Sequence, residues 1–226
     1  MKRQPPHSPA RSQRFDDYLG HLTRCAGHAD RVIPMENYTK GLLLPLERKS
    51  VEPMAARLAP GNVRRMHQSL HHIVADAAWS DAALLREMRE QVLPAMTRRH
   101  KLLAWIVDDT GFPKKGTHSV GVTRQYCGQV GKQGNCRIAV SVSLATEQAS
   151  LPARYRLYLP GNWAGDAKLR SKAGVPDEIR FQTKQEIALD QIRSLLEEGV
   201  ERGVVLADAA YGNDHGFREH LEGLEL

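Results

Sequence analysis

The chain has 226 residues, of which 41% are apolar, so it can bury a core in one large domain or two small ones. A net charge of +6 favours a polyanionic partner such as DNA or RNA. Three widely spaced cysteines exclude a disulfide framework, and no apolar run is long enough to span a membrane or to act as a secretory signal. We therefore expect a cytoplasmic protein without membrane insertion.

The first hundred residues predict a basic arm followed by helices. Residues 1–14 contain four Lys or Arg, three Pro and no acidic residue, which is typical of a disordered arm. Residues 15–100 predict a helical domain. Its clearest helix is Asp81–His100, in which apolar residues recur at helical spacing, and a second helix is expected over Asn62–Trp79.

The pattern changes near residue 101, where short apolar and β-branched segments begin. Their order predicts β-β-β-α-β, so that residues 101–226 form an α/β domain behind the helical one. The expected strands are Leu102–Val107, Arg137–Ala145, Arg154–Leu159 and Val204–Ala207, and the expected helix is Gln185–Glu198.

Two of these strands end in carboxylates. Asp108 and Asp109 follow the first strand, and Asp208 follows the last. In open α/β sheets ligands bind at the carboxyl ends of strands, so Asp109 and Asp208 would meet there if the two strands are parallel neighbours. Adjacent carboxylates repel unless a cation separates them, and Mg²⁺ or Mn²⁺ suits such oxygen ligands. The alternative is that these aspartates only cap the following turns.

Basic residues cluster directly after the first carboxylates. Residues 111–116 predict a glycine-bounded turn, and the segment after it is rich in glycine. Neither a Walker A loop nor a dinucleotide-binding fingerprint is present. Positive charge beside a metal site suits a phosphodiester substrate, although lysines on a hairpin are also commonly just solvated. The candidate contacts to DNA phosphates are Lys114, Lys115, Arg124 and Lys132.

Several ordered motifs together resemble a family of insertion-sequence transposases with a DDE endonuclease domain. The resemblance covers about residues 15–225. The motifs that carry it are GLLLP (41–45), RKSVEP (48–53), IVDDTGFPKKG (106–116), HSVGV (118–122), RQYCG (124–128), ATE (145–147), YRLYLP (155–160) and GVVLADAAYG (203–212).

The resemblance implies a ribonuclease H-like catalytic domain behind a helical N-terminal domain. It implies DNA transposition by two-metal phosphodiester chemistry, with Mg²⁺ or Mn²⁺ as cofactor and double-stranded DNA at insertion-sequence ends as substrate. The family's first catalytic aspartate corresponds to Asp109, with Asp108 as the alternative, and its second corresponds to Asp208. Both are expected to be catalytic residues and metal ligands.

The family's third acidic residue is a glutamate on a later helix, and this chain shows no matching motif. Glu219, Glu222 and Glu225 lie close behind Asp208 and are left unassigned. The fifth strand of the fold is also missing, so we expect a truncated chain with an incomplete ribonuclease H-like domain that is inactive alone. The alternative is a catalytically inactive remnant that binds DNA or dimerises, and so interferes with intact transposase.

Overall fold

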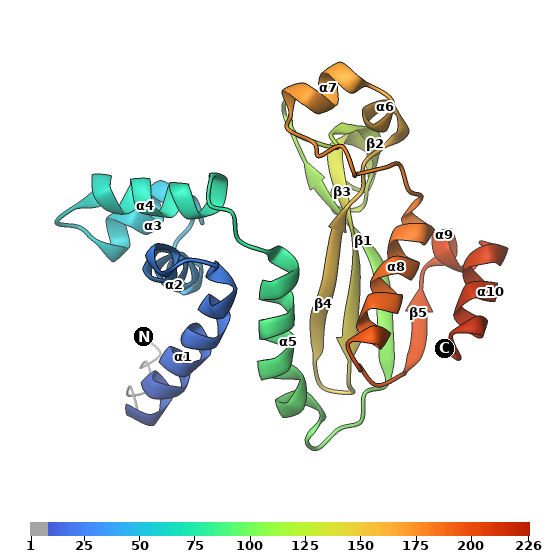
Figure 1. Ribbon diagram of the computed structural model, residues 1–226, viewed down its shortest axis with the longest axis horizontal. Helices are drawn as coiled ribbons and strands as arrows, with labels where there is room; N and C mark the ends of the chain where they lie inside the picture. The colour runs from blue at the N-terminus through green and yellow to red at the C-terminus, as the bar shows by residue number, and fades with distance from the viewer. Residues whose placement is uncertain (1–8) are drawn as a thin grey trace. The chain divides into compact units, whose positions relative to one another are not determined.

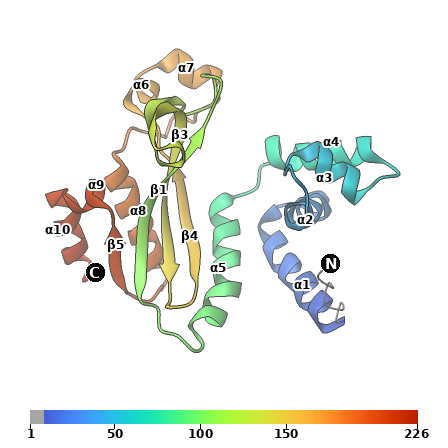
Figure 2. The ribbon, with the colours of Figure 1, turned by 180° about the vertical axis from the view of Figure 1, so that it is seen from behind.

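The computed structural model describes residues 9–226, which form ten α-helices, two short 3-10 helices and one five-stranded mixed sheet (Figures 1 and 2). The chain divides into two compact units, one ending at Val92 and the other spanning Leu93–Leu226. The predicted α/β class, with a helical region followed by a ribonuclease H-like sheet, is confirmed. None of the helices described is both long and apolar enough to cross a membrane.

The first unit is helical and has two small apolar cores. Met54 is fully buried in one of them, packed with Ala55 and Leu70. A Cβ on Gly41 would lie 2.9 Å from the Met54 sulfur, so glycine is required for the two helices that carry these residues to approach so closely. The elements are α1 (Pro9–Leu22), η1 (Thr23–Ala26), α2 (Ala29–Leu43), α3 (Val51–Leu58), α4 (Val63–Ala75) and most of α5 (Asp81–Thr97).

Part of the expected disordered arm is helical. Residues 9–14 form the start of α1, because Pro9 fits the first helical position, where its missing N–H is not needed. The rest of the arm, residues 1–8, lies outside the described residues. The two helices expected over Asn62–Trp79 and Asp81–His100 also end earlier than expected: α4 ends at Ala75 and α5 at Thr97.

The second unit contains the sheet. β3 pairs with β1 on one side and with both β2 and β4 on the other, and β1 in turn pairs with β5. Only the β1–β5 pairing is parallel. The strands are β1 (Ala104–Pro113), β2 (Thr123–Cys127), β3 (Lys132–Ala145), β4 (Ser150–Leu157) and β5 (Val204–Ala207). The short 3-10 helix η2 (Gly128–Val130) connects β2 to β3.

Helix α8 (Lys184–Glu197) covers one face of this sheet and closes the main core. It begins with a capping box between Thr183 and Glu186 and is followed by Gly199 in the left-handed region, φ 75°. The core packs the α8 side chains against β1, β3 and β4, with Trp105 and Ile192 fully buried. The remaining helices are α6 (Gly161–Ala164), α7 (Ala167–Lys172), α9 (Ala209–Gly212) and α10 (His215–Gly223).

Two expectations about the sheet were wrong. β1 does not end at Asp108 and Asp109 but continues through the segment expected to be a turn as far as Pro113, which pairs with Cys136 of β3. The glycine-rich segment after it contains a strand, β2, that the pattern did not indicate. In both cases pairing with the long β3 outweighs the local turn preference of glycine and proline. The predicted strand Val204–Ala207 is confirmed.

Candidate active site

The two predicted aspartates lie at the edge where β1 and β5 run parallel. The pairing of these strands runs from Ala104 opposite Val204 to Val107 opposite Ala207. Asp208 is the next residue after β5. Asp109 lies two residues beyond Val107, the last β1 residue that pairs with β5. Side chains alternate along a strand, so Asp109 lies on the same face as the buried Val107, towards α8. The sheet thus brings together carboxylates that are 99 residues apart in sequence.

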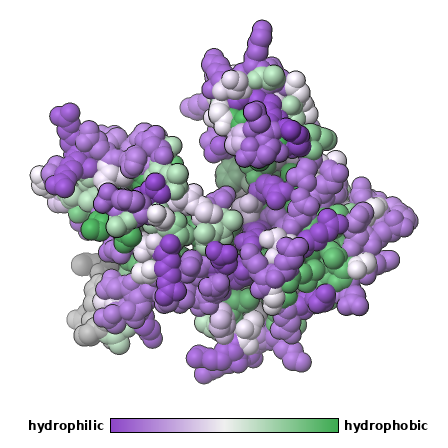
Figure 3. Space-filling model, viewed as in Figure 1, coloured by the Kyte–Doolittle hydropathy of each residue, from purple (hydrophilic) through white to green (hydrophobic). Residues whose placement is uncertain are grey.

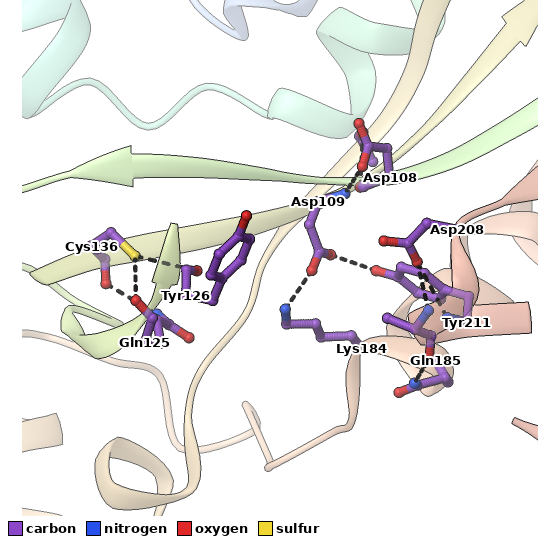
Figure 4. Close-up of polar contacts among 11 residues, drawn as sticks. Asp108, Asp109, Gln125, Tyr126, Cys136, Lys184, Gln185, Asp208 and Tyr211 are labelled. Carbon is purple, nitrogen blue, oxygen red and sulfur yellow. Dashed lines mark hydrogen bonds and ion pairs between the residues drawn. The ribbon is translucent and has the colours of Figure 1, made fainter. Parts of the chain in front are cut away.

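Both oxygens of the Asp109 carboxylate are held by side chains from other elements (Figure 4). The Tyr211 hydroxyl donates a hydrogen bond to Oδ1 at 2.5 Å. The Lys184 ammonium forms an ion pair with Oδ2. Lys184 also lies over the ring of Tyr158, 5.7 Å from its centroid. The Asp109 side chain is 25% exposed, so the site remains open to solvent and ligands.

Tyr211 is a buried hydrogen-bond donor. It lies on α9 and packs against Phe217, with the ring centroids 5.7 Å apart. Burial raises the pKa of the Tyr211 hydroxyl well above its usual value, and the hydrogen bond to Asp109 and the negative charge around it raise it further. Tyr211 therefore stays protonated at neutral pH and orients the Asp109 carboxylate as a donor.

Asp208 combines an exposed position with a structural role. Its Oδ1 accepts hydrogen bonds from the backbone N–H of Ala210, at 2.9 Å, and of Tyr211, at 3.4 Å, which caps α9. The capping role considered from the sequence is therefore present at Asp208. Oδ2 makes no hydrogen bond to any residue the structure describes, so it can take a further ligand. The cap also fixes the carboxylate beside Tyr211, the residue that holds Asp109.

Asp108, the alternative to Asp109, lies on the other face of β1. Figure 4 shows it pointing away from Lys184 and Tyr211. Its Oδ1 accepts a hydrogen bond from the backbone N–H of Asp109 at 2.7 Å. The geometry therefore favours Asp109 as the partner of Asp208.

The four predicted DNA-binding residues lie away from the carboxylates. Lys114 and Lys115 directly follow β1. Arg124 lies on β2, opposite Asn135 of β3, and Lys132 is the first residue of β3. Lys114 is five residues beyond Asp109 along an extended chain, which corresponds to about 17 Å. The structure therefore groups these cations around the β2–β3 hairpin, separate from the paired aspartates.

Two residues of the site were missed from the sequence, Lys184 and Tyr211. One signal was available for Lys184, because a lysine in the first turn of a helix faces the positive end of the helix dipole and is disfavoured there. Such a lysine indicates an acidic partner elsewhere in the fold. Tyr211 follows Asp208 by three residues and lies inside the GVVLADAAYG motif (203–212) that carries the family resemblance, but the sequence assigned it no role.

The donor set suits a divalent cation with a preference for oxygen. Asp109 and Asp208 supply carboxylate oxygens, and Asp109 already pairs with one positive group, the Lys184 ammonium. Mg²⁺ and Mn²⁺ accept a small number of carboxylates and complete their coordination with water and phosphate oxygens. In the part of the chain that the structure describes, no cluster of three His, Cys, Asp or Glu side chains could hold a metal. Glu219 on α10 instead pairs with His215 at 3.3 Å.

The fold is that expected of a DDE enzyme, and comparison with known proteins supports the same family. Residues 17–226 match the family described as DDE superfamily endonuclease, and the chain belongs to this family. It is also similar to the probable transposase for insertion sequence element IS701 of Microchaete diplosiphon, with 33% identity over 188 residues. The resemblance to insertion-sequence transposases is thereby confirmed.

The similarity covers the two proteins unequally. The matched region is 82% of this chain but 45% of the transposase, so this chain spans less than half the length of that relative. Endonucleases of the DDE superfamily generally depend on a divalent metal and act on DNA.

Proposed function

We propose that this chain takes part in DNA transposition and supplies two ligands, Asp109 and Asp208, of a divalent metal site that cleaves and transfers DNA strands at the ends of an insertion sequence. The observation that carries the proposal is the meeting of these carboxylates at one edge of a ribonuclease H-like sheet, in a chain of the DDE endonuclease family. The proposed metal is Mg²⁺ or Mn²⁺, because all the protein ligands are carboxylate oxygens.

In this proposal the protein's own residues prepare the site for a phosphodiester. Metal ions bound there would activate water, and then a DNA 3′-hydroxyl, for attack on the phosphodiester. Tyr211 holds the Asp109 carboxylate in a fixed orientation through its buried hydroxyl. The α9 cap does the same for Asp208. Both supports are rigid, because Tyr211 is packed in the main core.

The metal site is tested by titrating Mn²⁺ into the wild-type protein and into Asp109→Asn and Asp208→Asn. Each variant keeps the size of the side chain and removes one negative charge, so we expect weak binding by the wild type and at least tenfold weaker binding by each variant, since a charged ligand contributes more than about 1.4 kcal/mol. Asp108→Asn is the matched control, because its side chain lies on the opposite face of β1. Equal binding by all four proteins would refute the site.

The proposed DNA contacts form one basic lobe, made of the segment after β1, the β2–β3 hairpin, and α6 with α7. Residues 110–146 contain five Lys or Arg and no acidic residue. The Trp163 indole on α6 donates to the backbone carbonyl of Val122 at 2.8 Å, which anchors the α6–α7 segment on this hairpin. On the face seen in Figure 3, the surface over α6, α7 and β2 mixes hydrophilic and apolar residues. The positive charge of residues 110–146 suits the phosphate backbone of duplex DNA.

A second candidate function is favoured by the exposed edge of β5. In this function the chain binds DNA or another copy of itself, and interferes with intact transposase without cleaving DNA. Among the described strands β5 pairs with β1 alone, and its Val204 and Leu206 side chains are 64% and 50% exposed. An unpaired apolar edge invites pairing with another chain.

We therefore expect the 226-residue protein to self-associate as its concentration rises, and Leu206→Lys to shift it towards the monomer. A lysine on an edge strand opposes pairing through charge and solvation. Light scattering over a concentration series measures the effect. Ile33→Lys, at an exposed position on α2, is the matched control and should change nothing.

Nicking of DNA carrying the element's ends separates the two candidate functions. A stable monomer with strong metal-dependent nicking that Asp109→Asn abolishes would contradict the non-catalytic candidate. Self-association without nicking would support it.

A further inference from the structure

Lys184 occupies an energetically unfavourable position for a lysine. It is the first residue of α8, where the helix dipole is positive and the neighbouring backbone N–H groups are only partly satisfied. The capping box of Thr183 and Glu186 uses the local acidic side chain, because Glu186 accepts from the Thr183 backbone and hydroxyl. The negative charge that offsets the unfavourable position of the Lys184 ammonium therefore comes from Asp109, 75 residues earlier in the sequence.

The direction of the Lys184 side chain is set by packing as well as by charge. Its ammonium lies 5.7 Å from the centre of the Tyr158 ring, which is within the range of a cation–π contact. The lysine thus lies over the Tyr158 ring while its ammonium pairs with Oδ2 of Asp109. Figure 4 shows the pair of Lys184 and Asp109. Because Tyr211 holds Oδ1, the two contacts together occupy both oxygens of the carboxylate.

A divalent cation that binds Asp109 must therefore compete with the Lys184 ammonium for the carboxylate. The ammonium lies directly on the carboxylate that the cation needs, and two positive groups cannot share one carboxylate at close range without repulsion. Tyr211 differs from Lys184, because a neutral hydroxyl can keep its hydrogen bond while the other oxygen binds a cation. The ion pair is also partly exposed, with 30% of the Lys184 side chain accessible, so it can be opened at low cost.

We propose that Lys184 is a positioning residue that holds Asp109 in place of a metal ion and is displaced when Mg²⁺ or Mn²⁺ binds. This inference rests on the proposed function, since it requires Asp109 to be a metal ligand. In the metal-free protein the ammonium offsets the charge of the neighbouring aspartates and keeps the Asp109 carboxylate oriented. After displacement the ammonium is free beside the site to pair with another anion, such as a DNA phosphate.

The test is a Mn²⁺ titration of four proteins, in which metal binding is measured by a spectroscopic or calorimetric signal. The proteins are the wild type, Lys184→Met, Lys184→Arg and Lys172→Met. Lys184→Met keeps an apolar stem over Tyr158 but removes the competing charge, so we expect about two- to tenfold tighter Mn²⁺ binding, as for release from a partly exposed ion pair. Lys184→Arg keeps the charge and should bind as the wild type does. Lys172→Met removes the same charge from the exposed end of α7 and should leave the affinity unchanged.

A second measurement uses the wild-type protein alone and so does not depend on how a variant folds. Acetylation of lysines with an amine-reactive reagent, read by mass spectrometry, should increase at Lys184 when Mn²⁺ is added, and stay constant at Lys172. Unchanged labelling of Lys184 at saturating Mn²⁺ would overturn the displacement.

The outcomes also separate this inference from the proposed function. If Lys184→Met binds Mn²⁺ equally or more weakly than the wild type, while Asp109→Asn weakens binding at least tenfold, the metal site stands and the competition by Lys184 is wrong. If Asp109→Asn binds Mn²⁺ like the wild type, or if no protein of the series binds it, both the metal site and the inference fail.

Discussion

Replacing the four cations of the β2–β3 region with glutamine is expected to remove most of the salt dependence of DNA binding. The changes are Lys114→Gln, Lys115→Gln, Arg124→Gln and Lys132→Gln in one protein. Each cation that contacts a phosphate contributes about 0.9 to the slope of log affinity against log salt concentration, so four contacts contribute about 3.6. The slope should therefore fall by about 3 to 4, and affinity at low salt should fall with it. Fluorescence anisotropy with a short labelled duplex at several salt concentrations measures both.

A charge-matched control shows whether the effect belongs to these positions. Substituting glutamine for four exposed arginines of the helical unit changes the net charge by the same amount; these are Arg57, Arg64, Arg65 and Arg86. If the contacts lie around the β2–β3 hairpin, this control keeps a steep slope. An equal loss of slope in both proteins would mean that DNA is attracted by the overall charge, and the assignment of the four residues would be withdrawn.

Trp105→Ala is expected to destabilise the second unit by about 3 to 5 kcal/mol. The Trp105 side chain is fully buried between the sheet and α8, and its indole N–H donates to the backbone carbonyl of Glu201 at 3.1 Å. The substitution leaves a large cavity behind the strand that carries Asp109, and removes the tie between β1 and the segment before β5. Urea unfolding followed by fluorescence measures the loss.

The tryptophans allow this unit to be followed separately. Trp163 is buried in the second unit, whereas Trp79 belongs to the helical one. In a background of Trp79→Phe, the remaining fluorescence reports on the second unit alone. Trp105→Phe is the conservative control: it keeps an aromatic ring in the core and loses the hydrogen bond, so it should cost clearly less. A loss below about 1 kcal/mol for Trp105→Ala would contradict the central place of this residue in the core.

The elements best predicted from the sequence are those whose pattern is local. Val204–Ala207 is a short apolar run bounded by Gly203 and Asp208, and it forms a strand with these bounds. The amphipathic helix expected over Gln185–Glu198 is α8, displaced by a single residue at each end. Spacing along a few turns or a few strand residues is enough to identify such elements, because each buries one face in the core.

The extent of β1 could not be predicted in the same way. Gly111 and Pro113 favour a turn locally, yet both are strand residues paired with β3. A Cβ on Gly111 would lie 2.8 Å from the Cys127 sulfur, so the glycine serves the close approach of β2 and not a change of direction. A partner strand about 25 residues away decides this, and local propensity contains no information about it.

The sequence by itself determined the family, and it pointed to the two aspartates and to the positive segment that follows the first of them along the chain, because each is carried by consecutive residues. Only the tertiary structure decided which side chains surround Asp109. Lys184 and Tyr211 lie 75 and 102 residues from it along the chain, and the alternation of side chains places Asp108 on the other face of β1. The physical reason is that the site forms where β1, β5, α8 and α9 meet, and the packing of the main core, which no local pattern encodes, brings these elements together.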